Sequence, residues 1–269
     1  SVEDAPIAGA DTATTTEDTA VQLDVATLLA NDTDGDGDTL TITAVSGAAL
    51  DTGIITFTPP ANFTGDTTFQ YTVTDPSGLT GTGTVTVTVT AVPDAPIANT
   101  DAITAPEDGS GSVDVLGNDT DADGDAISLQ SFTQPGHGVV TFVGTVATYT
   151  PVADFNGADS FTYTIADGTG GIAVGTVDVS VTAINDAPIA FDDTVAVVEE
   201  TPTVVAALAN DFDIDADTLV FVAVTQGAHG SVQLAGGSVT YTPAANYFGP
   251  DGFDYTVSDG NGGTDSGRV

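Results

Sequence analysis

The sequence has 269 residues, enough for one large domain or for two to three small ones. It contains 39 Asp and Glu residues, one Arg and no Lys, so its formal net charge is −38. This charge excludes nucleic acid and anionic membrane surfaces as partners, since both require arrays of Lys and Arg. The absence of Cys excludes disulfides and thiolate metal sites, and no apolar run is long enough to insert into a membrane.

The sequence repeats itself three times. Asp-Ala-Pro-Ile-Ala occurs at residues 4–8, 94–98 and 186–190, and Tyr-Thr-(Val/Ile)-x-Asp begins at Tyr71, Tyr163 and Tyr255. A period of about 90 residues predicts three copies of one domain, with boundaries at 1–92, 93–184 and 185–269. Val269 aligns with Val85 and Val177, so we expect the third copy to be cut short in its last strand.

Within each copy, apolar residues alternate with polar ones, as along Thr84–Thr90, and Gly, Pro, Asn and Asp separate the alternating runs. This pattern favours short β-strands, with one short helix expected near residues 26–30. Seven strands per copy indicate an all-β fold of tandem immunoglobulin-like, Greek-key β-sandwiches. In the first copy we expect strands near residues 6–15, 19–25, 39–46, 48–51, 53–58, 66–74 and 81–91.

The motifs of each copy resemble those of a known family. Asn-Asp-x-Asp-(Gly/Ala)-Asp-Gly-Asp at residues 31–38 and 118–125, the Tyr-Thr-(Val/Ile)-x-Asp run and the Asp-Ala-Pro linker are similar to the cadherin-like tandem repeats of large bacterial surface adhesins. The resemblance covers essentially the whole chain. It implies an extended array at the cell surface or outside the cell that binds calcium, has no enzymatic activity, and acts as a spacer or adhesive module.

The order of the strands predicts where the acidic residues gather. Loops after the second, fourth and sixth strands of a copy share the end at which the chain enters, and the other loops share the end at which it leaves. Carboxylates from successive copies therefore converge at each linker. For the first linker these residues are Glu17, Asp18, Asp66, Asp94, Asp119, Asp121, Asp123, Asp125 and Asp167. For the second linker they are Glu107, Asp108, Asp159, Asp186, Asp211, Asp213, Asp215 and Asp259, and the matching loop residues of the first copy are Asp34, Asp36 and Asp75.

Such clusters need a cation, because two carboxylates 5 Å apart repel by about 3 kcal/mol at an effective dielectric of 20. Calcium accepts roughly six to eight oxygen ligands in irregular geometry, whereas zinc prefers His and Cys. Magnesium stays as the alternative. An EF-hand is excluded because Thr43 and Gln130 occupy the twelfth loop positions, where that motif requires a Glu.

The cadherin resemblance also implies roles for individual residues. Asp121 and Asp123 match the family's Asp-Ala-Asp element, Glu107 its strand glutamate and Asp186 its linker aspartate; Asp167 matches the aspartate between its last two strands. The linkers here are less acidic than is typical of the family. The number of ions per linker therefore stays open, as does whether each site bridges two copies or lies within one.

No catalytic constellation is predicted, and the chain is not expected to be an enzyme. Asp51-Thr52-Gly53 occurs once, whereas an aspartic protease needs two such turns. The alternatives to a spacer are a module that binds carbohydrate or other copies of the same protein, and a subunit of an extracellular filament. A carbohydrate site would need an exposed aromatic platform, for which Phe221, Tyr247 and Phe248 are the candidates.

Overall fold

The computed structural model describes residues 2–269, which form short β-strands with very little helix. By spatial contact the chain divides into two compact units. The first contains the chain up to Asn99 together with Leu116–Phe132 and Tyr163–Gly175, and the second contains Thr100–Val115, Thr133–Thr162 and Thr176–Val269. Within residues 2–269, no helix is long and apolar enough to cross a membrane.

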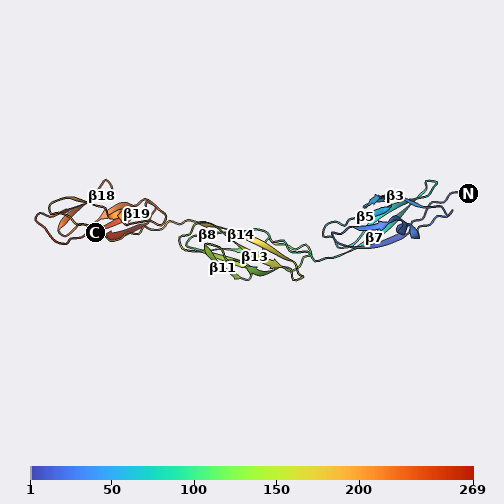
Figure 1. The fold of residues 1–269 in the computed structure, drawn as a ribbon, viewed down its shortest axis with the longest axis horizontal. Coiled ribbons are helices and arrows are strands. Elements are labelled where there is room, and N and C mark those ends of the chain that lie inside the picture. Colours follow the sequence, from blue (N-terminus) through green and yellow to red (C-terminus); the bar gives the residue numbers. More distant parts are fainter. Residues whose placement is uncertain (1) are drawn as a thin grey trace. The chain divides into compact units, whose positions relative to one another are not determined.

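The first repeat has two facing layers, a four-stranded sheet of order β1-β7-β6-β3 and a three-stranded sheet of order β2-β5-β4 (Figure 1). β1 pairs in parallel with β7, and the remaining neighbours are antiparallel. Its strands are β1 (Ala10–Thr16), β2 (Val21–Asp24), β3 (Thr41–Ser46), β4 (Ala49–Asp51), β5 (Ile54–Phe57), β6 (Gly65–Thr74) and β7 (Thr80–Thr90). The predicted all-β, immunoglobulin-like fold is confirmed.

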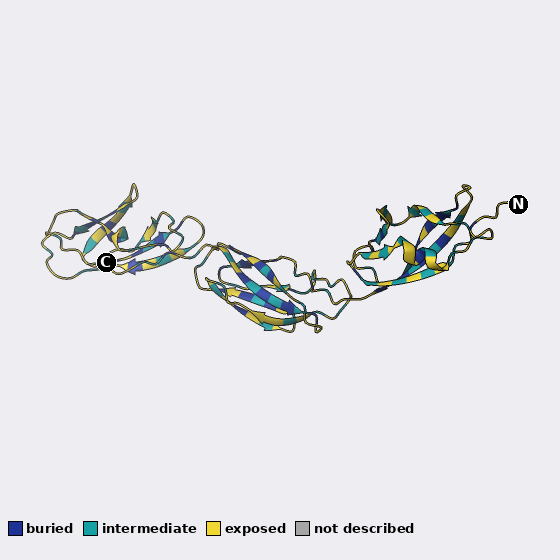
Figure 2. Cartoon of the chain, turned by 45° about the vertical axis from the view of Figure 1, so that its right-hand side comes forward, coloured by how far each residue is buried: buried dark blue, intermediate teal, exposed yellow. Residues whose placement is uncertain are grey.

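The alternating sequence explains how the first sandwich forms its core. Val85, Val87 and Val89 on β7 are at most 2% exposed, while the Thr residues between them face outwards. They pack with Phe69 and Tyr71 of β6. Figure 2 shows the same alternation of buried and exposed positions along the strands. Burial of the apolar face holds the register, because a slip by one residue would turn every Val towards solvent.

The start of the first strand and the bounds of the short helix differ slightly from the prediction. The first strand begins at Ala10 rather than near residue 6, because Ile7 forms only an isolated bridge with Thr33. The expected helix is α1 (Val25–Leu28), followed by the 3-10 turn η1 (Leu29–Asn31). Asp24 starts this helix by accepting a hydrogen bond from the Ala26 N–H at 2.7 Å.

The second repeat has the same strand order, with sheets β10-β13-β14-β8 and β11-β12-β9. β8 pairs in parallel with β14, as β1 does with β7. Its strands are β8 (Asp101–Pro106), β9 (Gly111–Asp114), β10 (Ser128–Phe132), β11 (Gly138–Val143), β12 (Val146–Pro151), β13 (Gly157–Ala166) and β14 (Ile172–Thr182).

The third repeat forms sheets β15-β18-β17 and β16-β19-β20. Residues 192–199 form no strand, although the aligned residues of the other repeats form β1 and β8. A groove of about 600 Å³ lies there, lined in part by Val195 and Phe253. The elements of the third repeat are β15 (Thr203–Val205), η2 (Ala207–Ala209), β16 (Val220–Val224), β17 (Gly230–Ala235), β18 (Ser238–Pro243), β19 (Asp254–Ser258) and β20 (Thr264–Arg268).

Candidate metal centres

Each repeat carries an acidic loop in which one aspartate, Asp34, Asp121 or Asp213, accepts hydrogen bonds from the backbone of the loop that follows it. In the second repeat, Asp121 Oδ1 accepts the N–H groups of Asp123 at 3.0 Å and Asp125 at 3.1 Å. Asp34 and Asp213 make the same pair of contacts in the other repeats. The loop thus ties one oxygen of this aspartate to its own backbone and leaves the second oxygen, Oδ2, buried and without a hydrogen-bond partner.

The linker aspartate is held over this loop by its backbone. The Asp94 N–H donates to Asp123 Oδ2 at 2.8 Å, and the Asp186 N–H donates to Asp215 Oδ2 at 2.7 Å. Asp4 and Asp36 make the equivalent contact at 2.8 Å. The backbone N–H of the repeated Asp-Ala-Pro motif therefore makes the same contact with the acidic loop in each repeat.

A buried glutamate at the end of the first strand completes the arrangement. Glu17 follows β1, is 4% exposed, and accepts the Val92 N–H on Oε1 at 2.6 Å. Its other oxygen has no hydrogen-bond partner. Glu107 follows β8, is 2% exposed, accepts the Ile184 N–H, and uses its second oxygen to accept the side-chain amide of Asn156 at 3.2 Å.

These contacts gather carboxylate oxygens into compact clusters. Glu17, Asp94 and Asp123 each offer an oxygen within 4.8 Å of the others, and all three belong to the first compact unit. Glu107, Asp186 and Asp215 do the same within the second unit. Two further clusters lie within the acidic loops, at the same separation: Asp121, Asp123 and Asp125, and Asp213, Asp215 and Asp217.

The electrostatics of these clusters are unfavourable without a cation. Burial, followed by the charges of Asp123 and Glu17, raises the pKa of Asp94 above its usual range. Burial and the charges of Asp108, Asp154 and Asp215 raise the pKa of Asp186 in the same way. The chain has no Lys, and its single Arg, Arg268, donates to Asp254 at 3.0 Å rather than to any cluster.

Seven buried side-chain atoms in residues 2–269 have no hydrogen-bond partner, and all seven are carboxylate oxygens of predicted ligands. Buried polar atoms rarely go unpaired in native proteins, so an unpaired buried oxygen needs an explanation, and coordination of a cation is one. A hard cation with oxygen ligands fits this donor set, whereas no Cys and only two His are present for a softer metal. The seven residues are Glu17, Asp34, Asp75, Asp94, Asp121, Asp186 and Asp213.

Three predicted ligands, Asp75, Asp167 and Asp259, lie in the turn before the last strand of their repeats, and in each the backbone of the turn donates to a carboxylate oxygen. Asp167 Oδ1 accepts the N–H groups of Thr169, Gly170 and Gly171 at 2.7 to 3.0 Å. Burial alone would raise the pKa of Asp167, but these hydrogen bonds outweigh it and hold the pKa low. Asp259 makes the matching contacts and also accepts the Asn185 side chain at 2.7 Å. None of the three joins the clusters described above.

Asp119, Asp211 and Asp66 were also predicted as ligands but belong to none of the clusters in residues 2–269. Asp119 accepts the Asn99 N–H and the Tyr163 hydroxyl, and Asp211 likewise accepts the Phe191 N–H and the Tyr255 hydroxyl. Asp66 accepts the Thr88 hydroxyl at 2.7 Å on the exposed surface.

Sequence reasoning did not select every acidic residue that the fold uses. Asp217 belongs to a cluster, and extending the Asp-x-Asp spacing by two residues beyond Asp215 would have indicated it. Asp11 and Asp32 both contact the Tyr71 hydroxyl, at 2.9 and 3.0 Å, and form a polar cluster that sequence reasoning did not anticipate.

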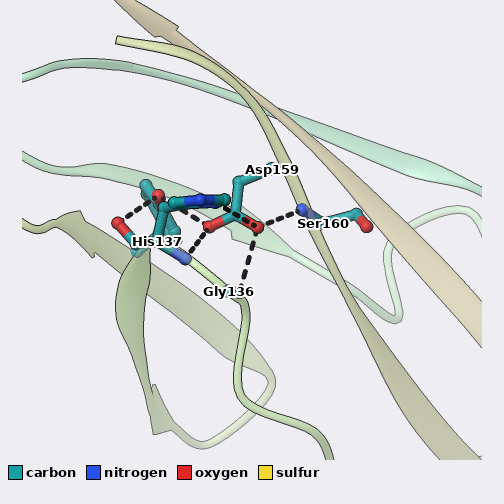
Figure 3. Close-up of polar contacts among 5 residues, drawn as sticks. Gly136, His137, Asp159 and Ser160 are labelled. Carbon is teal, nitrogen blue, oxygen red and sulfur yellow. Dashed lines mark hydrogen bonds and ion pairs between the residues drawn. The ribbon is translucent and has the colours of Figure 1, made fainter. Parts of the chain in front are cut away.

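Asp159, which was predicted to gather at the second linker, is in none of the carboxylate clusters of residues 2–269, and both of its oxygens accept hydrogen bonds from its own repeat. Figure 3 shows it between the N–H groups of Gly136, His137 and Ser160, which donate at 3.1, 2.8 and 2.9 Å. The Tyr149 hydroxyl also donates to it at 3.0 Å. Through these hydrogen bonds Asp159 stabilises the loop before β11. Asp251 makes matching contacts with the loop before β17 in the third repeat.

The three aromatic candidates for a carbohydrate platform differ in their surroundings, although Tyr247 and Phe248 both line the groove of the third repeat. Phe221 packs edge-on against buried Tyr255, with ring centroids 5.7 Å apart. Tyr247 stacks on His229 at 4.2 Å. Phe248 is 88% exposed.

The sandwiches and the acidic loops beside their linkers define a tandem immunoglobulin-like, cadherin-like repeat protein. The sequence model of the bacterial Ig domain matches residues 3–88, 93–180 and 185–269. The chain therefore belongs to the bacterial Ig domain family.

Solved structures share this fold. The extracellular cadherin domains 1–4 of protocadherin gamma B7 align with a TM-score of 0.54 at 11% identity, over 99% of this chain and 75% of that one. Domains EC21-23 of human CDH23 align with a TM-score of 0.53 at 16% identity, over 97% of both chains. An endo-fucoidan hydrolase aligns with a TM-score of only 0.29, too low to bear on activity.

One curated relative has a higher sequence identity over a short stretch. The protein GAMETE EXPRESSED 2 of Arabidopsis thaliana is 46% identical over 82 residues. This match covers 30% of the present chain and 9% of the plant protein, so it concerns about one repeat.

Proposed function

We propose that this chain is a calcium-stiffened spacer or adhesion segment of a large bacterial surface or secreted protein. The observation that carries the proposal is the set of seven buried carboxylate oxygens without hydrogen-bond partners, all on residues predicted to be ligands. A structural aspartate in a turn has its oxygens paired with backbone N–H groups, as Asp159 does. The seven oxygens lack such partners and are available to a cation.

Calcium suits these positions better than other cations. The clusters combine flexible loop carboxylates with a buried glutamate, and calcium tolerates the irregular geometry that such a mixture produces. Magnesium requires near-ideal octahedral geometry and gives up water reluctantly, so it should bind less tightly. Glu17, Asp94, Asp121 and Asp123 would hold the ion at the first linker, and Glu107, Asp186, Asp213 and Asp215 would hold it at the second.

The position of the ligands in the sequence explains why the ion would stiffen the chain. Glu17 belongs to the first repeat, Asp94 to the linker and Asp123 to the second repeat, so one ion would join all three segments. Pro96 already restricts the backbone φ of the linker. Without the ion, repulsion between the carboxylates would push the first repeat, the linker and the second repeat apart.

The proposal is tested by calcium titration followed by calorimetry and small-angle X-ray scattering. Calcium bound only by the folded state should raise the melting temperature by mass action, and magnesium at equal concentration should raise it less. Scattering should report a narrower range of particle lengths with calcium than after chelation. An unchanged melting temperature and unchanged scattering after exhaustive chelation would contradict the proposal.

A double variant distinguishes a bridging site from a site within one repeat. Asp121→Asn with Asp123→Asn removes two anionic ligands at the first linker and leaves the second linker intact. A bridging ion predicts one flexible linker in calcium, with every sandwich still folded. Loss of stability in the second repeat without added flexibility at the linker would instead favour an internal site.

A further inference from the structure

The third repeat carries two phenylalanine rings on its surface. Phe191 and Phe212 stack with centroids 6.1 Å apart and an interplanar angle of 28°, and each side chain is 47% exposed. The backbone fixes both residues. The Phe191 N–H donates to Asp211 Oδ1 at 2.8 Å, and Ile189 and Phe212 exchange a pair of backbone hydrogen bonds.

The aligned positions in the other repeats show that the fold does not need these rings. The bridge between Ile189 and Phe212 corresponds to the bridges from Ile7 to Thr33 and from Ile97 to Thr120. By the same alignment, Gly9 and Asn99 stand where the third repeat has Phe191. Since small or polar residues serve the fold elsewhere, the aromatic pair is a surface feature particular to the third repeat. Exposed apolar groups placed together in this way commonly mark an interaction site.

The surroundings of the pair define the chemistry of a partner. Asp192 follows Phe191 in the sequence and is exposed, and one of its oxygens accepts the backbone N–H of Arg268 at 3.0 Å. Asp211 and Asp213 flank Phe212, but both are engaged within the fold, so Asp192 is the carboxylate of this set that a partner can reach. Aromatic faces and carboxylates both attract cations, and an Arg side chain can stack its planar guanidinium on a ring while bonding to a carboxylate.

The chain cannot supply that cation itself. Its single Arg, Arg268, already donates to Asp254 at 3.0 Å, and the sequence contains no Lys. A second copy would bring another net charge of −38 and would be repelled. We propose that the Phe191–Phe212 pair is a docking site for an arginine-bearing segment of a different protein.

The test is isothermal titration of the calcium-saturated chain, at about 0.15 M salt, with a synthetic peptide that carries Arg at alternate positions. The matched variant is Phe191→Asn with Phe212→Thr, which installs the residues of the second repeat and leaves the net charge unchanged. We expect at least tenfold weaker binding by this variant. If the unaltered chain and the variant bound the peptide equally well, charge alone would explain the attraction and the proposal would be overturned. Absence of peptide binding by the unaltered chain would overturn it as well.

A second measurement does not depend on the folding of the variant. The ring signals of Phe191 and Phe212 in nuclear magnetic resonance spectra of the unaltered chain should shift when the peptide is added. A peptide in which citrulline replaces Arg, which keeps the shape and removes the charge, should leave them in place. Shifts confined to the acidic loops, or equal shifts with the citrulline peptide, would overturn the proposal.

Discussion

Glu17 and Val92 are 75 residues apart in the sequence, yet the Glu17 carboxylate accepts the Val92 N–H at 2.6 Å. Glu107 and Ile184 repeat this contact in the second repeat, 77 residues apart. One oxygen of each glutamate thereby fixes the start of the linker that leaves its own repeat. In Glu17 the other oxygen lies buried without a hydrogen-bond partner. The same side chain can thus anchor the linker and bind a cation.

Substitution of Glu17 by Gln separates these two roles. The amide keeps a carbonyl oxygen for the Val92 N–H, but it removes one negative charge from a cluster that also contains Asp94 and Asp123. Without calcium we expect equal or greater stability, because repulsion falls. With calcium we expect about tenfold weaker binding at the first linker, which corresponds to about 1.4 kcal/mol. Calorimetry in calcium and in chelator measures both effects.

The control for this experiment is Glu199→Gln. Glu199 aligns with Glu17 but is exposed and belongs to none of the carboxylate clusters found in residues 2–269. Calcium affinity should be unchanged. If Glu17→Gln and Glu199→Gln behaved alike, Glu17 would not be a ligand.

Asp123 should matter more than Asp125 for calcium binding. Asp123 belongs both to the cluster with Glu17 and Asp94 and to the cluster within the acidic loop, whereas Asp125 belongs only to the latter. Asp123→Asn should therefore weaken calcium binding at the first linker by about tenfold or more, and Asp125→Asn by less. Titration calorimetry of the two variants compares them directly. The reverse order of affinities would contradict the assignment of Asp123 as the shared ligand.

The repeats made much of this architecture predictable. The spacing of Asp121 and Asp123 and the position of Asp94 in a short linker were sufficient to predict that these carboxylates converge. The sequence did not reveal that Asp167 would be surrounded by the N–H groups of its own turn, because that depends on the turn's backbone conformation. The Phe191–Phe212 stack was also missed, since it depends on a bridge between residues outside any regular strand.

The acid stability of the second repeat should depend on Asp159. Burial would raise the pKa of Asp159, but the N–H groups of His137, Ser160 and Gly136 and the Tyr149 hydroxyl hold it below its usual value. A carboxyl whose pKa is lower in the folded state stabilises the fold above its unfolded pKa of about 3.9, and this contribution is lost as the pH falls through the folded value. Asp159→Asn should therefore reduce stability at pH 7 by about 1–3 kcal/mol.

The difference between Asp159→Asn and the unaltered chain should shrink as the pH falls from about 3.9, where the unfolded carboxyl takes up a proton, towards the lower pKa of the folded carboxyl. Urea unfolding at neutral and acidic pH, followed through resonances of the second repeat, measures this. Asp178→Asn is the control, because Asp178 is exposed on β14. A difference between Asp159→Asn and the unaltered chain that did not change with pH would show that the Asp159 charge contributes nothing.

Gly83 provides the most direct test of the core. It lies opposite Tyr71 in the pairing of β6 with β7, and a Cβ placed on it would lie 2.2 Å from Cζ of the Tyr71 ring. Gly83→Ala would force this ring to move, although its hydroxyl is held by Asp11 and Asp32. Overpacking of this kind costs about 1–3 kcal/mol, so the first repeat should unfold at lower urea concentration. Thr82→Ala, on the exposed face of β7, should cost less than about 1 kcal/mol.

Gly175 and Gly267 face Tyr163 and Tyr255 in the same way, at 2.3 and 2.5 Å, so the corresponding Ala variants should each destabilise their own repeat. Unchanged stability in Gly83→Ala would mean that the Tyr71 ring has room to yield, and that its polar contacts do not fix its position.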